Sequence, residues 1–502
     1  MSFAAALSQA RRMPFDVATL EWLAETALAE DGEIDALTLV ERAAEAGNDA
    51  RLWQWTGLLY RSLADHRRAI AAFKRATMAA PDDPLIARGS AQVALEAGIP
   101  AVASFDRALQ LAPLSDDAVF GLAAARLASG DGSGAMAGLA AVVSAHPTWT
   151  SGHERLSQLR WMLGDRTAAT TSFDEALAQL PDNIPLWQTL IAILSRSRQF
   201  DAALTAIARA RFRIGAAPFL DAYEAVAASE LGDEAKGDRL FARLAESADP
   251  MLAVHRVRHL LRFRRVDEAA TLIEPRLVAE DPLLWPYAAI VWRLNGDPRI
   301  AWLEQPALVS VIDLADVLPP LDELADHLTA LHRATDRHLD QSVRGGTQTD
   351  GDLLLRIDPL IVALRMAILD AVKDHLDKLP VGDGRHPILM HRRDRPIRLA
   401  GSWSVRLAGA GFHDSHIHPA GWFSSALYIA LPDAVTRGED NSGWLALGAP
   451  PREFANDLGP SRLIEPKPGR LVLFPSTMWH ATLPFADGER LTVAFDVARP
   501  RP

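Results

Sequence analysis

A repeat of about 34 residues constrains the fold of this chain more than any other feature of its sequence. Prolines recur at positions 81, 113, 147 and 181, at spacings of 32, 34 and 34 residues. Ahead of each proline, small residues let two helices approach closely, a larger residue between them fills the gap to the next repeat, and the proline ends the second helix. The pattern therefore predicts stacked helix pairs. The signatures are Ala69-Phe73-Ala76, Ala101-Phe105-Ala108, Ala135-Leu139-Val142 and Ala169-Phe173-Ala176.

The fullest copy of the repeat lies between residues 50 and 81. Trp53, Gly57 and Tyr60, followed by the first signature and Pro81, fit the tetratricopeptide pattern W-x2-L-G-x2-Y, A-x3-F, P. Copies beyond residue 211 are degenerate but keep the helical period. We predict an all-α, tetratricopeptide-like solenoid within residues 1–303, with its repeats beginning near residue 16. A fifth copy is carried by Trp187, Ala203, Ile207 and Ala210.

The character of the sequence changes after residue 380. Short β-rich runs separated by Pro, Gly and Asp replace the alanine-rich helices: SWSVRLAG, GWFSSALYIALP, GWLALG, GRLVLFPS and RLTVAFDV. Strands at such short spacing predict a small antiparallel barrel or sandwich in residues 380–502. Residues 304–379 are predicted to be a helical linker, with an amphipathic helix in 352–380 leading into the strands. The fold class expected is α+β in two parts.

Composition excludes several classes of function. Lys and Arg number 52 against 64 Asp and Glu, and this net charge of −12 argues against a nucleic-acid or anionic-membrane partner. The absence of cysteine excludes disulfides, iron–sulfur clusters, thiol nucleophiles and Cys-ligated zinc. No run of about 18 apolar residues and no secretory signal is found, so we expect no membrane span and a cytoplasmic protein.

Histidines cluster where the β-rich part begins. The run GFHDSHIHPAGW places His413, Asp414, His416 and His418 together at the entry to a predicted strand. Because side chains alternate along a strand, Asp414, His416 and His418 should share one face and His413 the other. Two imidazoles at i and i+2 can bind one metal ion. A third candidate ligand is His480, 62 residues after His418.

The order of these residues resembles a known family. His416-Ile-His418, then His480, then Arg490-Leu-Thr492 resemble the motif of iron(II)- and 2-oxoglutarate-dependent oxygenases, whose domain is a double-stranded β-helix of the jelly-roll or cupin type. The fuller resemblance is to such oxygenases with N-terminal tetratricopeptide repeats, and it covers about residues 335–498. It is carried by DQSVRGGTQT, SWSVRL, HIHPAGWFSSALYIALP and PGRLVLFPSTMWH.

The resemblance implies a cofactor, a cosubstrate and an activity. The three histidines would hold Fe(II) as a facial set, leaving three positions for 2-oxoglutarate and dioxygen. Arg490 would pair with the distal carboxylate of 2-oxoglutarate, and Thr492 and Tyr428 would add hydrogen bonds. The expected activity is that of a dioxygenase, hydroxylating a protein or peptide that the solenoid recruits on its concave surface.

One residue departs from the family pattern. The usual ligand set is two histidines and one carboxylate, whereas residue 418 is a histidine. A neutral third ligand would leave the iron more electropositive. Asp414 is an alternative ligand, on the predicted face of His416 but in reversed order. The run Arg344-Gly345-Gly346 is a lid over the site, a contact for substrate, or a tight turn without a chemical role.

Two other functions remain open from the sequence. The chain could be a non-catalytic tetratricopeptide scaffold with a degenerate β domain, because fold does not fix function. It could also be a three-histidine metal dioxygenase that does not use 2-oxoglutarate. Arg490-x-Thr492 argues against that last alternative, since it would leave no cosubstrate carboxylate for the arginine to hold.

Overall fold

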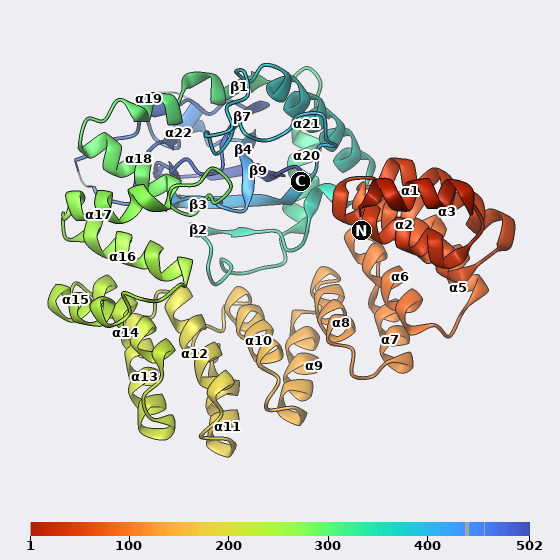
Figure 1. Cartoon of the computed structure of the whole chain (residues 1–502), viewed down its shortest axis with the longest axis horizontal. Helices are drawn as coiled ribbons and strands as arrows, with labels where there is room; N and C mark the ends of the chain where they lie inside the picture. The colour runs from red at the N-terminus through yellow and green to blue at the C-terminus, as the bar shows by residue number, and fades with distance from the viewer. Residues whose placement is uncertain (1, 437–440, 456, 502) are drawn as a thin grey trace.

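The computed structural model describes residues 2–436, 441–455 and 457–501, and it has a helical array followed by a β domain (Figure 1). The array curves around one side of the β domain, so the two parts share a long boundary. Its helices are α1 (Phe3–Arg12), α2 (Val17–Glu30), α3 (Glu33–Gly47), α4 (Ala50–Ser62), α5 (His66–Ala79), α6 (Pro84–Glu96), α7 (Val102–Leu111), α8 (Asp116–Ala128), α9 (Gly132–Ala145), α10 (Thr150–Met162), α11 (Thr171–Gln179), α12 (Ile184–Arg196), α13 (Phe200–Ile214), α14 (Pro218–Glu230), α15 (Glu234–Arg243), α16 (Pro250–Arg262), α17 (Val266–Ile273), α18 (Trp285–Leu294) and α19 (Arg299–Leu303).

The repeat pattern has the packing that its residue types predict. Phe73 on α5 is fully buried, and a Cβ added to Gly57 on α4 or Gly89 on α6 would lie within 2.7 Å of its ring. The glycines therefore make room for the large residue within one repeat and towards the next. Asp49 and Asp83 cap helices α4 and α6 by accepting hydrogen bonds from free backbone N–H groups. The predicted all-α solenoid is confirmed.

The β domain is one curled antiparallel sheet with its strands in the order β1-β7-β4-β9-β3-β8-β5-β6, and β2 pairs with β3. This sheet confirms the predicted two-part α+β fold, with a β domain of the double-stranded β-helix type. The strands are β1 (Ser310–Asp313), β2 (Val343–Gln348), β3 (Leu399–His416), β4 (Gly421–Ala430), β5 (Leu445–Leu447), β6 (Arg462–Ile464), β7 (Arg470–Pro475), β8 (His480–Thr482) and β9 (Glu489–Ala498).

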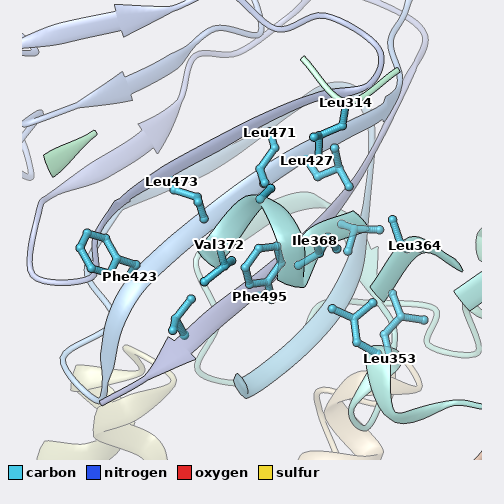
Figure 2. Packing of buried hydrophobic residues seen from close by; sticks show 14 of the residues in the cluster. Leu314, Leu353, Leu364, Ile368, Val372, Phe423, Leu427, Leu471, Leu473 and Phe495 are labelled. Carbon is cyan, nitrogen blue, oxygen red and sulfur yellow. The ribbon is translucent and has the colours of Figure 1, made fainter. Parts of the chain in front are cut away.

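The core of the β domain lies between the sheet and helix α21 (Pro359–Asp377), with α20 (Leu321–Leu331) beside it. Figure 2 shows Leu364, Ile368 and Val372 of α21 facing side chains of the sheet. This helix covers the outer face of β4, β7 and β9 and leaves their other face to form the cavity described below. The sheet residues in the cluster include Phe423, Leu427, Leu471, Leu473 and Phe495. The short helix α22 (Asp433–Thr436) follows β4.

The segment 304–379 is not the purely helical linker that the sequence predicts. It contributes β1, which pairs with β7, and β2, which pairs with β3. The run around Gly345 and Gly346 looks like a turn in sequence, but the long strand β3 offers it a partner edge. A Cβ on Gly346 would lie 2.3 Å from the Arg406 carbonyl oxygen, so glycine permits this close pairing. The predicted limits 1–303, 304–379 and 380–502 put β1 and β2 in the linker. Their pairing with β7 and β3 makes both strands part of the β domain.

Both ends of the array contact the β domain. Near the N-terminus, buried Asp31 and Glu33 accept hydrogen bonds from Arg398 at 2.9 and 2.8 Å, and Arg501 also contacts both carboxylates. Near the other end, the Trp479 indole donates to the Pro286 carbonyl at 2.9 Å. The array is thus fixed to the β domain at two distant places.

A segment of the chain also lies along the inner side of the array. Residues 333–341, which we call the strap, connect α20 to β2. The backbone N–H groups of Thr335 and Asp336 both donate to the Met162 carbonyl, and Asp336 forms a bidentate ion pair with Arg166. Leu339 is buried in the cluster formed by α10 to α14. The middle of the array's inner surface is therefore filled by the chain itself.

No helix among the described residues is long and apolar enough to cross a membrane.

Candidate functional site

A cavity opens within the curled sheet, on the face that α21 does not cover. Strands β3, β4, β8 and β9 supply most of its walls, and the end of the strap and β2 close one side. Its lining residues are Gln341, Ser342, Val343, Gln348, Trp403, Val405, His413, His416, His418, Ser424, Ser425, Ala426, Leu445, Phe474, His480, Ala481, Thr482, Arg490, Thr492, Ala494 and Asp496.

Three of the predicted site residues meet in this cavity. One nitrogen atom from each of His416, His418 and His480 lies within 4.8 Å of the others. His416 ends β3 and pairs directly with His480, which begins β8, and their ring centroids are 4.1 Å apart. His418 follows two residues after β3. Three imidazoles at this separation can bind one metal ion.

Hydrogen bonds fix which nitrogen of each ring faces its neighbours. His416 Nδ1 lies 2.8 Å from the Asp414 carbonyl oxygen, and His480 Nδ1 lies 3.0 Å from the Met478 carbonyl oxygen. A carbonyl oxygen can only accept, so both Nδ1 atoms carry the proton and the Nε2 lone pairs are free. His418 Nδ1 lies 2.7 Å from the Asp496 carboxylate. All three rings are therefore oriented as in metal sites.

The surroundings keep the imidazoles of His416 and His480 neutral. Burial lowers the pKa of His416 and His480 well below the usual 6.5, and the neighbouring imidazoles reinforce the shift. Neutral imidazole is the form that binds a metal ion. These two residues therefore need no deprotonation before a metal ion binds at neutral pH.

The predicted faces of His413 and Asp414 are wrong. His413 lines the cavity, with its Nδ1 atom 3.1 Å from Thr482 Oγ1, while Asp414 pairs with Arg344 at 2.6 Å outside the histidine group. The cause is a β-bulge: three steps along β3 from His413 match two steps along β8, which interrupts the alternation of side chains. Burial lowers the pKa of His413 to about 3.

Arg490 is a buried cation without a counterion in the part of the chain that the structure describes. It lines the cavity, is 2% exposed, and its Nε and Nη1 atoms have no hydrogen-bond partner among the described residues. Its guanidinium carbon lies 5.0 Å above the ring of Tyr428, and burial lowers its pKa. An unpaired buried charge is costly, so this position favours an anion. The buried Tyr428 hydroxyl also lacks a partner among these residues.

One face of β9 supplies four lining residues at period two: Arg490, Thr492, Ala494 and Asp496. Thr492 pairs across the sheet with Tyr428, so both stand beside the arginine, although only Thr492 lines the cavity. The sequence interpretation missed Asp496. Counting by twos from Arg490 along the predicted strand could have found it, because residues i, i+2, i+4 and i+6 share a face.

The predicted lid or turn at Arg344-Gly345-Gly346 is an edge strand. Arg344 donates to the Gln341 carbonyl at 2.9 Å and pairs with Asp414, and Gly345 has a φ of +68° at the irregularity between β2 and β3. Gln341, Ser342 and Val343 line the cavity beside it. This segment is therefore a wall of the cavity, continuous with the strap.

Comparison with known proteins supports the predicted resemblance. Residues 401–496 match the model of a family described as "Putative 2OG-Fe(II) oxygenase". These residues contain all three histidines, Arg490 and Asp496. A search of the curated proteins finds no match for the chain.

Solved structures similar to this chain include tetratricopeptide proteins. MamA from Desulfovibrio magneticus is 17% identical over 33% of this chain and 95% of its own, with a TM-score of 0.29. YrrB, described as a TPR protein with an unusual peptide-binding site, is 18% identical over 37% of this chain and 96% of its own, with a TM-score of 0.28. A repeat protein from Parabacteroides merdae is 12% identical over 46% and 93%, with a TM-score of 0.28.

Proposed function

We propose that this chain, whose C-terminal part resembles the 2-oxoglutarate-dependent oxygenases, is an iron(II)- and 2-oxoglutarate-dependent dioxygenase that hydroxylates a protein or peptide. The observation that carries the proposal is that Arg490, whose Nε and Nη1 atoms have no partner among the described residues, lies in the same cavity as the three histidines. A metal site and an anion site within one cavity suit a cosubstrate that is both a metal ligand and a carboxylate.

The two alternatives account for less of the geometry. A three-histidine dioxygenase without 2-oxoglutarate leaves the buried Arg490 charge unpaired, at a cost of several kcal/mol. A scaffold without activity gives no reason for three imidazoles that each bring a nitrogen atom within 4.8 Å of the others. The proposed function gives each of these groups a ligand.

Each residue has a defined task in the proposed reaction. His416, His418 and His480 would hold iron through their Nε2 atoms, and the bound iron would supply the activation of dioxygen and the oxidation of substrate. Arg490 would bind the distal carboxylate of 2-oxoglutarate, with the Thr492 hydroxyl donating to it. The Tyr428 ring packs against the guanidinium group of Arg490. The buried side chains of Val405, Leu445 and Phe474 exclude water from the cavity.

A second cavity fits the recruitment of a peptide substrate. It has a volume of about 630 Å³ and lies between α4, α6 and α8 of the array and residues 349–356 of the β domain. Leu58, Leu85 and Phe120 give it apolar walls, and the ion pairs Arg61–Glu96 and Arg88–Asp117 give it polar ones. Residues 349–353 directly follow Gln348, which lines the histidine cavity. A peptide bound here would therefore lie beside the strand that walls the site.

Leu85→Asp tests this assignment with a matched control. Leu85 is 45% exposed in the first turn of α6, where an acidic residue suits the helix, so only the cavity should suffer. We expect a peptide array probed with the full-length protein to lose most of its bound sequences. Leu114→Asp changes a residue that is 78% exposed outside the cavity and should bind as the unaltered chain does. If both variants lose the bound peptides, or if both keep them, peptides bind elsewhere on the chain.

Anaerobic titration tests the proposed function itself. We expect iron(II) followed by 2-oxoglutarate to produce a visible metal-to-ligand charge-transfer band, because the cosubstrate would chelate the iron held by the histidines. Succinate, which lacks the keto group, serves as a control and should not produce the band. Iron binding without the band would favour the dioxygenase that does not use 2-oxoglutarate, and no iron binding would favour the scaffold.

A further inference from the structure

We propose that Asp496 is a positioning residue that supplies, through His418, the negative charge that the family's usual carboxylate ligand would bring. The inference rests on the proposed function, because it concerns the same metal site. It starts from the one residue in which this chain departs from the usual ligand set, a histidine at position 418.

The contact between the two residues is direct. Asp496 Oδ2 lies 2.7 Å from His418 Nδ1, and Asp496 is 8% exposed. It is the only acidic residue among the described residues that line the cavity. A carboxylate hydrogen-bonded to the outer nitrogen of a metal-binding imidazole raises the basicity of that ligand and fixes its orientation. His418 therefore need not behave as an ordinary neutral ligand.

The carboxylate is itself held in place. Ser424 Oγ donates to Asp496 Oδ1 at 2.6 Å and lies 2.9 Å from Ser476 Oγ. A Cβ added to Gly421 would lie 2.5 Å from Ser476 Oγ and 3.3 Å from Asp496 Cβ, so a glycine closes this cradle. The Trp403 ring lies parallel to the His418 ring, with the two ring centroids 5.8 Å apart. Rotation of either partner is restricted.

Charge balance explains why the carboxylate is needed. An iron(II) ion and Arg490 would bring three positive charges into the cavity, whereas 2-oxoglutarate brings only two negative ones. Three neutral histidines would leave one positive charge uncompensated in a buried space, which is unfavourable. Asp496 would cancel that charge without occupying a coordination position.

Asp496→Asn removes the charge and keeps the size. We expect the full-length variant to bind Co(II), followed by its visible absorption, about 10–100-fold more weakly than the unaltered chain. Glu489→Gln is the matched control: it removes a carboxylate from the same strand, but Glu489 is exposed and pairs with Arg406 outside the cavity. Its Co(II) affinity should not change.

Moving the charge gives a sharper test. In the double variant His418→Asp with Asp496→Asn the carboxylate becomes a ligand itself, and we expect at least tenfold recovery of Co(II) affinity over Asp496→Asn. His418→Asp alone places two carboxylates together and should bind Co(II) more weakly than the double variant. This comparison can be made even if Asp496→Asn does not fold. Equal affinities in the unaltered chain and Asp496→Asn, or no recovery, would overturn the role of Asp496 alone. Failure of the unaltered chain to bind Co(II) would overturn the proposed function as well.

Discussion

Arg490→Ala should lower the affinity for 2-oxoglutarate by at least about 30-fold, because truncation of a buried, charge-assisted pair costs roughly 2–5 kcal/mol. Co(II) affinity should stay within about twofold, since Arg490 is not one of the three residues that would bind the metal ion. Arg490→Lys should recover only part of the loss, because a single ammonium cannot reproduce the bidentate guanidinium. Isothermal titration of 2-oxoglutarate into the metal-loaded protein measures both variants.

Arg490→Leu should have a different effect on stability from its effect on cosubstrate binding. Without ligands, Arg490 is a buried charge whose Nε and Nη1 atoms lack partners among the described residues. Its replacement by leucine should leave the melting temperature unchanged or raise it. Added 2-oxoglutarate should then stabilise the unaltered chain and not the variant. This crossover separates a cosubstrate site from a structural arginine.

A suitable control is Arg406→Ala, which removes an arginine whose ion pair with Glu489 lies outside the cavity. It should leave 2-oxoglutarate affinity unchanged. If Arg490→Ala binds the cosubstrate normally, or if Arg490→Leu melts several degrees below the unaltered chain, Arg490 is a structural residue and the 2-oxoglutarate assignment fails even with a working metal site.

His480→Ala should reduce Co(II) affinity by at least about 100-fold. Binding free energies of about 10–16 kcal/mol shared among four ligands in structural zinc sites suggest roughly 2.5–4 kcal/mol for each ligand. The thermal stabilisation that Co(II) gives the unaltered chain should disappear with the ligand. Absorption titration and thermal melts in the presence of the metal measure the two effects.

The cavity provides its own control for this prediction. His413 lines the same cavity and stacks beside His416 at 5.9 Å, but it bonds to Thr482 and lies outside the histidine group. His413→Ala should change Co(II) affinity by less than tenfold. The reverse result, with His413 essential and His480 dispensable, would show that the ligand set has been chosen incorrectly.

The sequence predicted those features that depend on regular spacing. The helical array followed from the repeat, because Phe73 and Gly57 stand at positions where stacked helices must interlock. The proximity of His416 and His480 was predicted from the motif spacing. In the structure the two residues pair directly in neighbouring strands.

The sequence failed where the spacing is irregular. Strict alternation placed His413 on the wrong face, because a bulge has no clear signal in residues 413–416. Strand β2 looked like a turn because its glycines are rare in strands, and only the edge of β3 made it a strand. Asp496 was missed because the family motif ends at Thr492, whereas Asp496 lies four residues further along the same strand.

The contacts at both ends of the array also restrict how this protein can change in length. A solenoid is ordinarily open-ended, since each repeat touches only its neighbours and copies can be added or lost. Here Asp31 and Glu33 hold one end to the β domain, and the contact of Trp479 with Pro286 holds the other. One helix pair more or fewer would displace an end by about 16–20 Å. The number of repeats is therefore as fixed as the number of strands in a closed barrel.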